Sequence, residues 1–217
     1  MRILILNPNS DQETHELLQR VADDFLQGRA CADVVSMKSA PKLIVTYEDQ
    51  AAAAAEMVQV VRAKKDDYDG FVLACHGDPN LDLLQELTGK PTYGIAQVSM
   101  KIAAMKGDFA VLTPSEKIIS KKFALARKYQ CQEQLKVVQV SSGNGKEELL
   151  DAGREALKTP GVQAVVLGCA NYAGNSGWLE KRLDYFKGVP VLDGLTWALA
   201  LVESEARIQN YNRKQAE

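Results

Sequence analysis

Short apolar runs that alternate with helical stretches are the feature that most narrows what this chain can fold into. Eight runs are rich in Val, Ile and Leu and end in small or turn residues, as buried strands of parallel sheets do. The expected strands are Arg2–Leu6, Asp33–Met37, Gly70–Ala74, Thr92–Ile95, Asp108–Leu112, Leu135–Val140, Val162–Gly168 and Val189–Leu192. The expected helices are Asp11–Leu26, Glu48–Lys65, Leu81–Leu87, Val98–Met105, Ser115–Lys128, Lys146–Leu157, Gly177–Phe186 and Leu195–Ile208. This alternation predicts βα units, and therefore an α/β fold with mainly parallel sheets.

The two halves of the chain share a local pattern, which indicates an internal repeat. Ile5–Ser10 and Val111–Glu116 each combine the end of an apolar strand, a polar residue, a proline and an Asn or Ser suited to cap a helix. Each half later supplies an apolar strand that ends at a cysteine, and then another strand with a proline at its start, Pro91 or Pro190. Any doubly wound fold repeats βα units, but the matched cysteines favour two similar lobes.

The length of the chain, 217 residues, is enough for one large domain or two small lobes. We expect a first lobe over residues 1–97 and a second lobe over residues 98–207. The last expected helix and the segment 208–217 are expected to return to the first lobe.

Two of the four cysteines come directly after an apolar run. Cys75 follows Gly70–Ala74, and Cys169 follows the run that ends at Gly168. A thiol at the carboxyl end of a parallel strand lies where open α/β sheets bind ligands. One such cysteine could be a small core hydrophobe, but two in the same pattern suggest two halves of one active site. Cys31 and Cys131 are expected to be core or surface thiols.

Two thiols can invert a carbon that lies next to a carbonyl group. A thiolate removes the proton from one face of the carbon, and a thiol returns a proton to the other face. A free thiol has a pKa of about 8.5, and a helix N-terminus directly after it would lower that pKa. We expect such turns at Gly77–Leu81 and Ala173–Gly177.

The oxygen that takes up the negative charge needs hydrogen-bond donors aimed at it. The donors available in the turns are Asn9, Ser10, Thr113, Ser115 and the backbone after each cysteine, at His76, Gly77, Ala170 and Asn171. Charged residues are scarce there. Asp78 is the exception, and we expect it to hold its loop. A Cys75–His76 dyad is disfavoured because adjacent residues of an extended stretch point in opposite directions. His15 is expected on the solvated surface.

Composition excludes several classes of function. The formal net charge of −2, from 26 Lys and Arg against 28 Asp and Glu, gives no basic surface for nucleic acid. The N-terminal apolar run is too short for a signal peptide or a membrane span, so we expect a cytoplasmic protein with free thiols. Because the chain has no C-x-x-C pair and no G-x-G-x-x-G loop, we expect no metal and no nucleotide cofactor.

Several of these segments resemble a known family. Asn7–Ser10, Ala74–Pro79 and Val166–Ala170 are similar to motifs of the aspartate/glutamate/hydantoin racemase superfamily, and most of all to its hydantoin and allantoin racemases. The segments Gly94–Ala96, Phe109–Thr113 and Pro190–Gly194 fit the same pattern, so the resemblance spans nearly the whole chain.

The resemblance implies two flavodoxin-like lobes with the active site in a cleft between them. It also implies cofactor-independent racemisation by Cys75 and Cys169, with Asn9, Ser10 and Thr113 among the substrate-binding residues. His76 stands where this branch often has another aromatic residue, and Asn171-Tyr172 replaces the usual Gly-Met. Related decarboxylases keep one of the two cysteines, so the presence of both argues against decarboxylation.

The function expected from these features is racemisation of a 5-substituted hydantoin, allantoin or similar small ureide, by a homo-oligomer. An amino-acid racemase for aspartate, glutamate or a broader set of substrates is an alternative. A non-catalytic protein that binds a small ligand is another.

Overall fold

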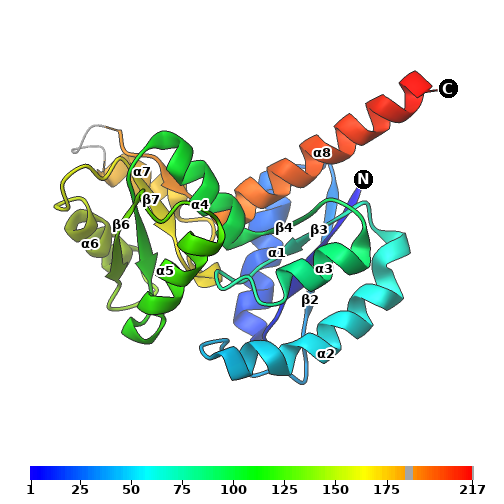
Figure 1. Cartoon of the computed structure of the whole chain (residues 1–217), viewed down its shortest axis with the longest axis horizontal. Helices are drawn as coiled ribbons and strands as arrows, with labels where there is room; N and C mark the ends of the chain where they lie inside the picture. Colours follow the sequence, from blue (N-terminus) through cyan, green and yellow to red (C-terminus); the bar gives the residue numbers. More distant parts are fainter. Residues whose placement is uncertain (184–187, 217) are drawn as a thin grey trace. The chain divides into compact units, whose positions relative to one another are not determined.

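The computed structural model describes residues 1–183 and 188–216, and all eight expected strands are present in it. Contacts between residues divide the chain into two compact units, residues 1–95 with 195–217 and residues 96–194. Each unit contains a four-stranded sheet. Helices flank the sheet in each unit (Figure 1). The predicted α/β fold with two similar lobes is therefore confirmed.

The two sheets have the same topology. Their strands are β1 (Arg2–Asn7), β2 (Cys31–Ser36), β3 (Gly70–Leu73) and β4 (Thr92–Gly94) in the first unit, and β5 (Phe109–Thr113), β6 (Leu135–Val140), β7 (Ala164–Leu167) and β8 (Val191–Leu192) in the second. The strand orders are β2-β1-β3-β4 and β6-β5-β7-β8, and every pair is parallel. Both orders follow the 2-1-3-4 arrangement of flavodoxin-like sheets. The repeat inferred from the sequence is thus present in the fold.

The helices agree with the expected stretches to within a few residues, apart from the last. They are α1 (Gln12–Leu26), α2 (Tyr47–Lys64), α3 (Leu81–Thr88), α4 (Ile95–Lys106), α5 (Ile119–Lys128), α6 (Lys146–Ala156), α7 (Ser176–Leu183) and α8 (Gly194–Ala216). Short 3₁₀ turns cover η1 (Lys65–Asp67), η2 (Glu116–Ile118) and η3 (Ala170–Tyr172). The helix expected to end at Phe186 has its end outside the described residues. The last helix, orange to red in Figure 1, continues well beyond Ile208.

Burial of both sheet faces explains why the strands read as continuous apolar runs. In the first sheet, Leu4 and Leu6 of β1 pack with Met57 of α2 and Leu84 of α3. In the second sheet, one face packs with α4 and α5, and the other with α6 and α7. Because side chains alternate along a strand, each run must be apolar at nearly every position.

The helix that follows the last strand of each sheet belongs to the other unit. Helix α4 follows β4, yet Met100 joins the core cluster of Phe109 in the second unit. Helix α8 follows β8, yet it packs in the first unit, where a Cβ on Gly70 would lie 2.3 Å from Val202 Cγ1. The first unit thus ends at residue 95 rather than the expected 97, and the second ends at residue 194 rather than the expected 207. The chain returns to the first unit from residue 195, where the last expected helix begins.

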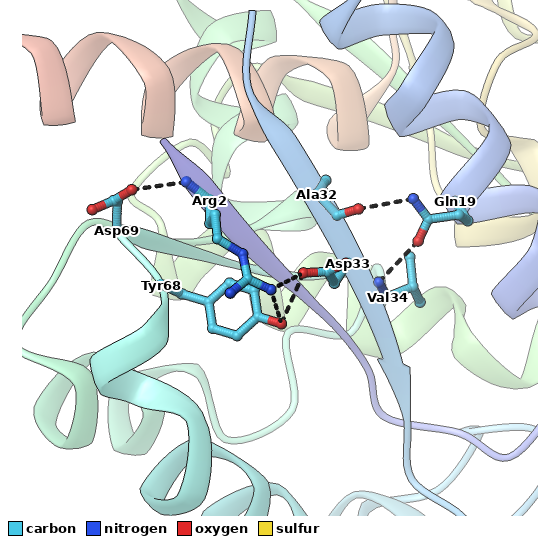
Figure 2. A network of polar contacts seen from close by, with 7 residues as sticks. All are labelled: Arg2, Gln19, Ala32, Asp33, Val34, Tyr68 and Asp69. Carbon is cyan, nitrogen blue, oxygen red and sulfur yellow. Dashed lines mark hydrogen bonds and ion pairs between the residues drawn. The ribbon is translucent and has the colours of Figure 1, made fainter. Parts of the chain in front are cut away.

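A polar network ties together the amino ends of the strands in the first unit (Figure 2). The Arg2 guanidinium donates to the Asp33 carboxylate at 2.8 Å, and the Tyr68 hydroxyl donates to the same carboxylate at 2.9 Å. The Arg2 hydrogen bond, followed by that of Tyr68, lowers the pKa of Asp33. This network lies at the amino ends of the strands, whereas Cys75 follows the carboxyl end of β3. We therefore assign the network a structural role.

The open edge of β2 is covered by a side chain of α1. Gln19 donates to the Ala32 carbonyl at 2.8 Å and accepts from the Val34 N–H at 3.0 Å (Figure 2). An edge strand with free backbone groups can pair with another chain, and this amide occupies two of those groups.

None of the helices in the described part of the chain combines the length and apolar character that a bilayer span requires.

Candidate active site

In each sheet, the strand that precedes a candidate cysteine lies beside the first strand of that sheet. Strand β3 pairs with β1, and the Ala74 N–H donates to the Leu6 carbonyl at 2.9 Å. Strand β7 pairs with β5, and the Gly168 N–H donates to the Leu112 carbonyl at 2.8 Å. This is the point where the strand order reverses, and open α/β sheets bind ligands at the carboxyl ends of such strands. Cys75 and Cys169 therefore occupy equivalent places in the two sheets.

The last residues of β1 and β5 are also equivalent, and both are polar and buried. Asn7 ends β1 and Thr113 ends β5. Asn7 Oδ1 and Thr113 Oγ1 both lack a hydrogen-bond partner within the described part of the chain. Thr113 was among the residues expected at the site, and Asn7 was not. The aligned motifs Asn7-Pro8 and Thr113-Pro114 are the signal that could have found it.

The turn after β1 positions Asn9 and Ser10, which are both partly buried. Asn9 Oδ1 accepts from Asn7 Nδ2 at 2.8 Å and from the Asp11 N–H at 2.9 Å. The Ser10 N–H donates to the Pro41 carbonyl at 3.2 Å. The residue that caps α1 is Asp11, whose carboxylate accepts from the Thr14 N–H at 2.9 Å. The Asn9 side chain shapes the turn instead of capping the helix as expected.

His15 is not the solvated surface residue that we expected. Its ring Nδ1 lies 3.0 Å from the Ser36 hydroxyl, and that hydroxyl also accepts from Asn7 Nδ2 at 3.0 Å. The reason is that the first turn of α1 packs against the end of β2. His15 thereby supports the strand end that carries Asn7.

The loop after β3 holds Cys75, His76 and Gly77. Cys75 and Gly77 are partly buried and His76 is buried. The Asp78 N–H donates to the Cys75 carbonyl at 2.9 Å, and Asp78 adopts a left-handed φ of 41°. The Asp78 carboxylate is packed over Gly94, where a Cβ would lie 2.4 Å from Asp78 Oδ1. This packing agrees with the loop-holding role expected for Asp78.

The loop after β7 holds Cys169, Ala170 and Asn171. The 3₁₀ turn η3 begins directly after Cys169, and the Tyr172 N–H donates to the Cys169 carbonyl at 3.1 Å. Ser115, another candidate donor, accepts from the Lys117 N–H at 3.2 Å and so caps η2. The second unit thus presents Thr113 and Cys169 at adjacent strand ends.

The pKa of the Cys169 thiol is raised, which corrects the expectation that a helix N-terminus lowers it. Burial is the largest influence and disfavours the thiolate. The Asn171 N–H and the Lys122 charge lower the pKa by smaller amounts. The turn that follows Cys169 is a single 3₁₀ turn, which is too short to carry the dipole of a helix.

Two residues that were not among the expected site residues lie close to the second cysteine. The buried Lys122 of α5 donates to the Gly168 carbonyl at 2.9 Å. Tyr172 is buried too, and its pKa is raised first by burial and then by the Cys169 charge, while Ser141 lowers it. Lys122 could have been found from its position beside Phe123 on the apolar stripe of α5, where a cation is unusual.

The remaining cysteines are free thiols, as expected. Cys31 is exposed at the start of β2. Cys131 is buried, and burial raises its pKa. Among residues 1–183 and 188–216, no three His, Cys, Asp or Glu side chains are grouped so that they could hold a metal ion.

Comparison with known proteins connects this arrangement to one family. The family model for Asp/Glu/Hydantoin racemase matches residues 3–202. The chain belongs to this family. A hydantoin racemase of Pseudomonas sp. (strain NS671) is 28% identical over 216 residues, which cover 94% of this chain and 85% of the relative. A hydantoin racemase of Paenarthrobacter aurescens is 27% identical over 217 residues, which cover 94% and 90%.

A solved structure agrees with the family assignment. An allantoin racemase from Klebsiella pneumoniae matches with a TM-score of 0.88 and 27% identity, over 96% of this chain and 89% of that one. These relatives of the racemase family are isomerases of the hydantoin and allantoin type. The branch inferred from the sequence motifs is therefore confirmed, as is the expectation of an isomerase of this type.

Proposed function

We propose that Cys75 and Cys169 transfer protons at the ring carbon of a 5-substituted hydantoin, allantoin or similar small ureide, and so interconvert its enantiomers. The observation that carries this proposal is the equivalence of the two thiols. Each is free, and each follows the third strand of its sheet at the ligand-binding edge. The hydantoin and allantoin racemases among the relatives support the choice of substrate class.

The proposed reaction balances with two thiols and no other reactant. One cysteine, as the thiolate, takes the proton from the substrate carbon, and the electron pair of the C–H bond moves onto the adjacent carbonyl oxygen. The other cysteine, as the thiol, gives its proton to the opposite face of the same carbon. Burial raises the pKa of Cys169 and favours its thiol form. Each cysteine is the base for one enantiomer and the acid for the other.

The proposed substrate contacts come from residues next to the two thiols. The polar side chains of Asn9, Ser10 and Thr113 would hold the ring. The residues after each cysteine, His76 and Gly77 in one loop and Ala170 and Asn171 in the other, would supply donors to the enolate oxygen. Such donors act on charge that develops during the reaction, and removing one of them typically costs about 10²–10³-fold in rate.

A neutral ring is favoured over a free amino acid by the charges in these loops. The turns after β1, β3, β5 and β7 contain no Arg. The structure also places the Lys122 ammonium near this part of the second unit, where it donates to the Gly168 carbonyl. Bidentate recognition of a carboxylate usually needs Arg. The alternative functions, against which this proposal is tested, are racemisation of an amino acid and non-catalytic binding of a small ligand.

The decisive experiment follows deuterium in D₂O at low conversion. Each pure enantiomer of a hydantoin, of allantoin and of aspartate is incubated with the protein, and both enantiomers are resolved by chiral mass spectrometry. With two thiols, the newly formed enantiomer carries deuterium while the remaining substrate stays protiated. Deuterium in both enantiomers from the start would show a single base, and a preference for aspartate would move the protein to the amino-acid racemases.

Variants identify the two bases. Cys75→Ala and Cys169→Ala should each lower racemisation by at least about 10²–10⁴-fold, the usual loss for a positioned acid or base. Cys31→Ser is the matched control, because Cys31 is exposed at the start of β2, and it should keep wild-type activity. A Cys169→Ala variant that racemises at the wild-type rate would end the two-thiol proposal.

Three further properties are proposed with the reaction. Because two thiols are enough to move the proton, we propose that catalysis needs no cofactor, which exhaustive dialysis against a chelator tests. We also propose a homo-oligomer, which sedimentation analysis tests, and a cytoplasmic location, which cell fractionation tests.

A further inference from the structure

A buried cation is hydrogen-bonded to the residue that precedes the second cysteine. Lys122 is 3% exposed and sits on the face of α5 that packs into the core, next to Phe123 and near Ala126. Burying an ammonium group is costly unless polar groups compensate for the lost water. The Lys122 ammonium donates to the Gly168 carbonyl at 2.9 Å, and Gly168 is the residue before Cys169. The charge is therefore held close to the backbone that carries the thiol.

The anchor for this ammonium cannot easily move. The Gly168 N–H donates to the Leu112 carbonyl at 2.8 Å, which continues the pairing of β7 with β5. A Cβ on Gly168 would lie 2.2 Å from the Leu112 carbonyl oxygen, so the two backbones are already in close contact. Such a fixed carbonyl keeps the position of the Lys122 charge constant.

Apart from the Asn171 N–H, which also lowers the pKa of Cys169, the rest of the surroundings of this thiol provides little compensation for a thiolate. Cys169 packs at the edge of an apolar cluster that includes Leu167 and Tyr172. The titratable groups that act on it are Lys122 from α5 and Tyr172 from η3. From the strand end after β8, the Asp193 carboxylate accepts the Gly174 N–H at 2.6 Å in the same loop. Of these three groups, Lys122 alone is a cation.

We propose that Lys122 is a positioning residue for proton transfer by Cys169, and that its anchored ammonium is the counter-charge that lets this partly buried thiol become a thiolate during turnover. The proposal rests on the proposed function, in which Cys169 accepts the proton when one of the two enantiomers is the substrate. Lys122 itself does not touch the reacting atoms. Its effect is on the fraction of Cys169 that can carry a negative charge.

The expected change in the thiolate fraction of Cys169 follows from the pKa shifts that nearby charges usually cause. An opposite charge close to an acid lowers its pKa by roughly one to three units. Removal of the Lys122 charge should therefore cut the thiolate fraction of Cys169 at neutral pH by about tenfold or more, since one pKa unit is a factor of ten. Loss of the hydrogen bond to the Gly168 carbonyl, with the positive charge kept, should change the thiolate fraction of Cys169 less.

The test separates charge from hydrogen bonding with three substitutions. Lys122→Arg keeps a charge and a donor, Lys122→Gln keeps a donor alone, and Lys122→Met keeps neither. Lys117→Gln is the matched control, because it removes an exposed Lys charge from η2, directly before α5. Circular dichroism checks that each variant is folded. If Lys122→Met does not fold, the Arg and Gln variants still compare a charged donor with a neutral donor at the same position.

The first readout is the pH dependence of iodoacetamide labelling at Cys169, followed by peptide mass spectrometry, which requires no turnover. We expect the Gln and Met variants to label about tenfold more slowly at pH 8, with the midpoint moved to higher pH. The Arg variant should stay within about threefold of the wild type, and the Lys117→Gln control should not change. Wild-type labelling in Lys122→Gln would overturn the proposal.

The second readout is the pH profile of kcat/KM with the hydantoin or allantoin that the wild type racemises. For the enantiomer from which Cys169 removes the proton, the acid limb of the profile should move to higher pH in Lys122→Gln and return in Lys122→Arg. If labelling shifts while this limb does not, the charge has no role in turnover and the proposal is wrong. If the wild type racemises no ureide, the proposed function fails, and the labelling result still decides whether Lys122 controls the thiol.

Discussion

The contact that fastens α8 to the first sheet should make a measurable, pH-dependent contribution to stability. The Tyr93 hydroxyl of β4 donates to the Glu205 carboxylate of α8 at 2.5 Å. Burial, followed by this hydrogen bond, raises the pKa of Tyr93 to about 12. Tyr93→Phe removes the hydroxyl and leaves the ring in place.

The expected magnitude follows from the charge and the exposure of the pair. A hydrogen bond to a charged group contributes about 1.5–3 kcal/mol, and partial exposure of Tyr93 reduces this to about 1–2 kcal/mol. For a chain of this size, that corresponds to a fall in Tm of about 2–8 °C at pH 8. Because a thermal scan of two units need not be two-state, urea unfolding with its m-value should accompany it.

The sign of the pH dependence is fixed by the raised pKa. The contribution of Tyr93 is present in full below pH 10, the pKa of an unperturbed tyrosine, and is lost as the pH rises from 10 to 12. By pH 11 the wild type should lose about 1.4 kcal/mol at most relative to Tyr93→Phe. The two stability curves should therefore converge above pH 10.

Two controls make this result specific. Tyr211→Phe changes an exposed tyrosine on the same helix and should leave stability unchanged. Glu205→Gln keeps a neutral acceptor and should cost less than Tyr93→Phe. Stability of Tyr93→Phe within about 0.5 kcal/mol of the wild type, with parallel curves from pH 8 to 11, would refute the reasoning.

Two further predictions concern the loop of Cys75 and the strand ends opposite it. Gly94→Ala should lower both kcat/KM and stability, because the new methyl group would meet the Asp78 carboxylate, whereas Gly177→Ala, which meets nothing within 4 Å, should be neutral or stabilising in urea unfolding. Asp33→Asn should reduce the dependence of the free energy of unfolding on pH in the acid range. The lowered pKa of Asp33 means that its contribution is present above about pH 4 and lost below it, so an unchanged pH dependence in urea titrations would contradict this.

The strands were predictable because burial on both sheet faces leaves a continuous apolar signal in the sequence. All eight are present, and their bounds differ from the expected ones by no more than two residues. The far end of α8 was not predictable in the same way. Beyond Ile208 the side chains at 209 and 211–215 are exposed, so no apolar period marks this part of the helix. Helix-forming residues such as Arg213 and Lys214 sustain it.

The site was predictable where it depends on strand ends and not where it depends on packing between elements. Cys75, Cys169 and Thr113 stand at the ends of strands, and their positions follow from the repeat. Lys122 reaches the site from a helix whose orientation the local sequence does not give. The pKa of Cys169 was predicted in the wrong direction because burial, which outweighs the local turn, is a property of the folded core.

Each of the helices that follow β4 and β8 packs in the unit that does not contain the preceding strand. This arrangement determines the order in which the two units can be completed during synthesis. Residues 96–194 are contiguous, so every part of the second unit has been made before α8 exists. The first unit has its whole sheet by residue 94 but must wait for about a hundred more residues before Val202 can cover Gly70 and Glu205 can meet Tyr93. The N-terminal unit of this chain is thus the last to be finished on the ribosome, although its strands are the first to emerge.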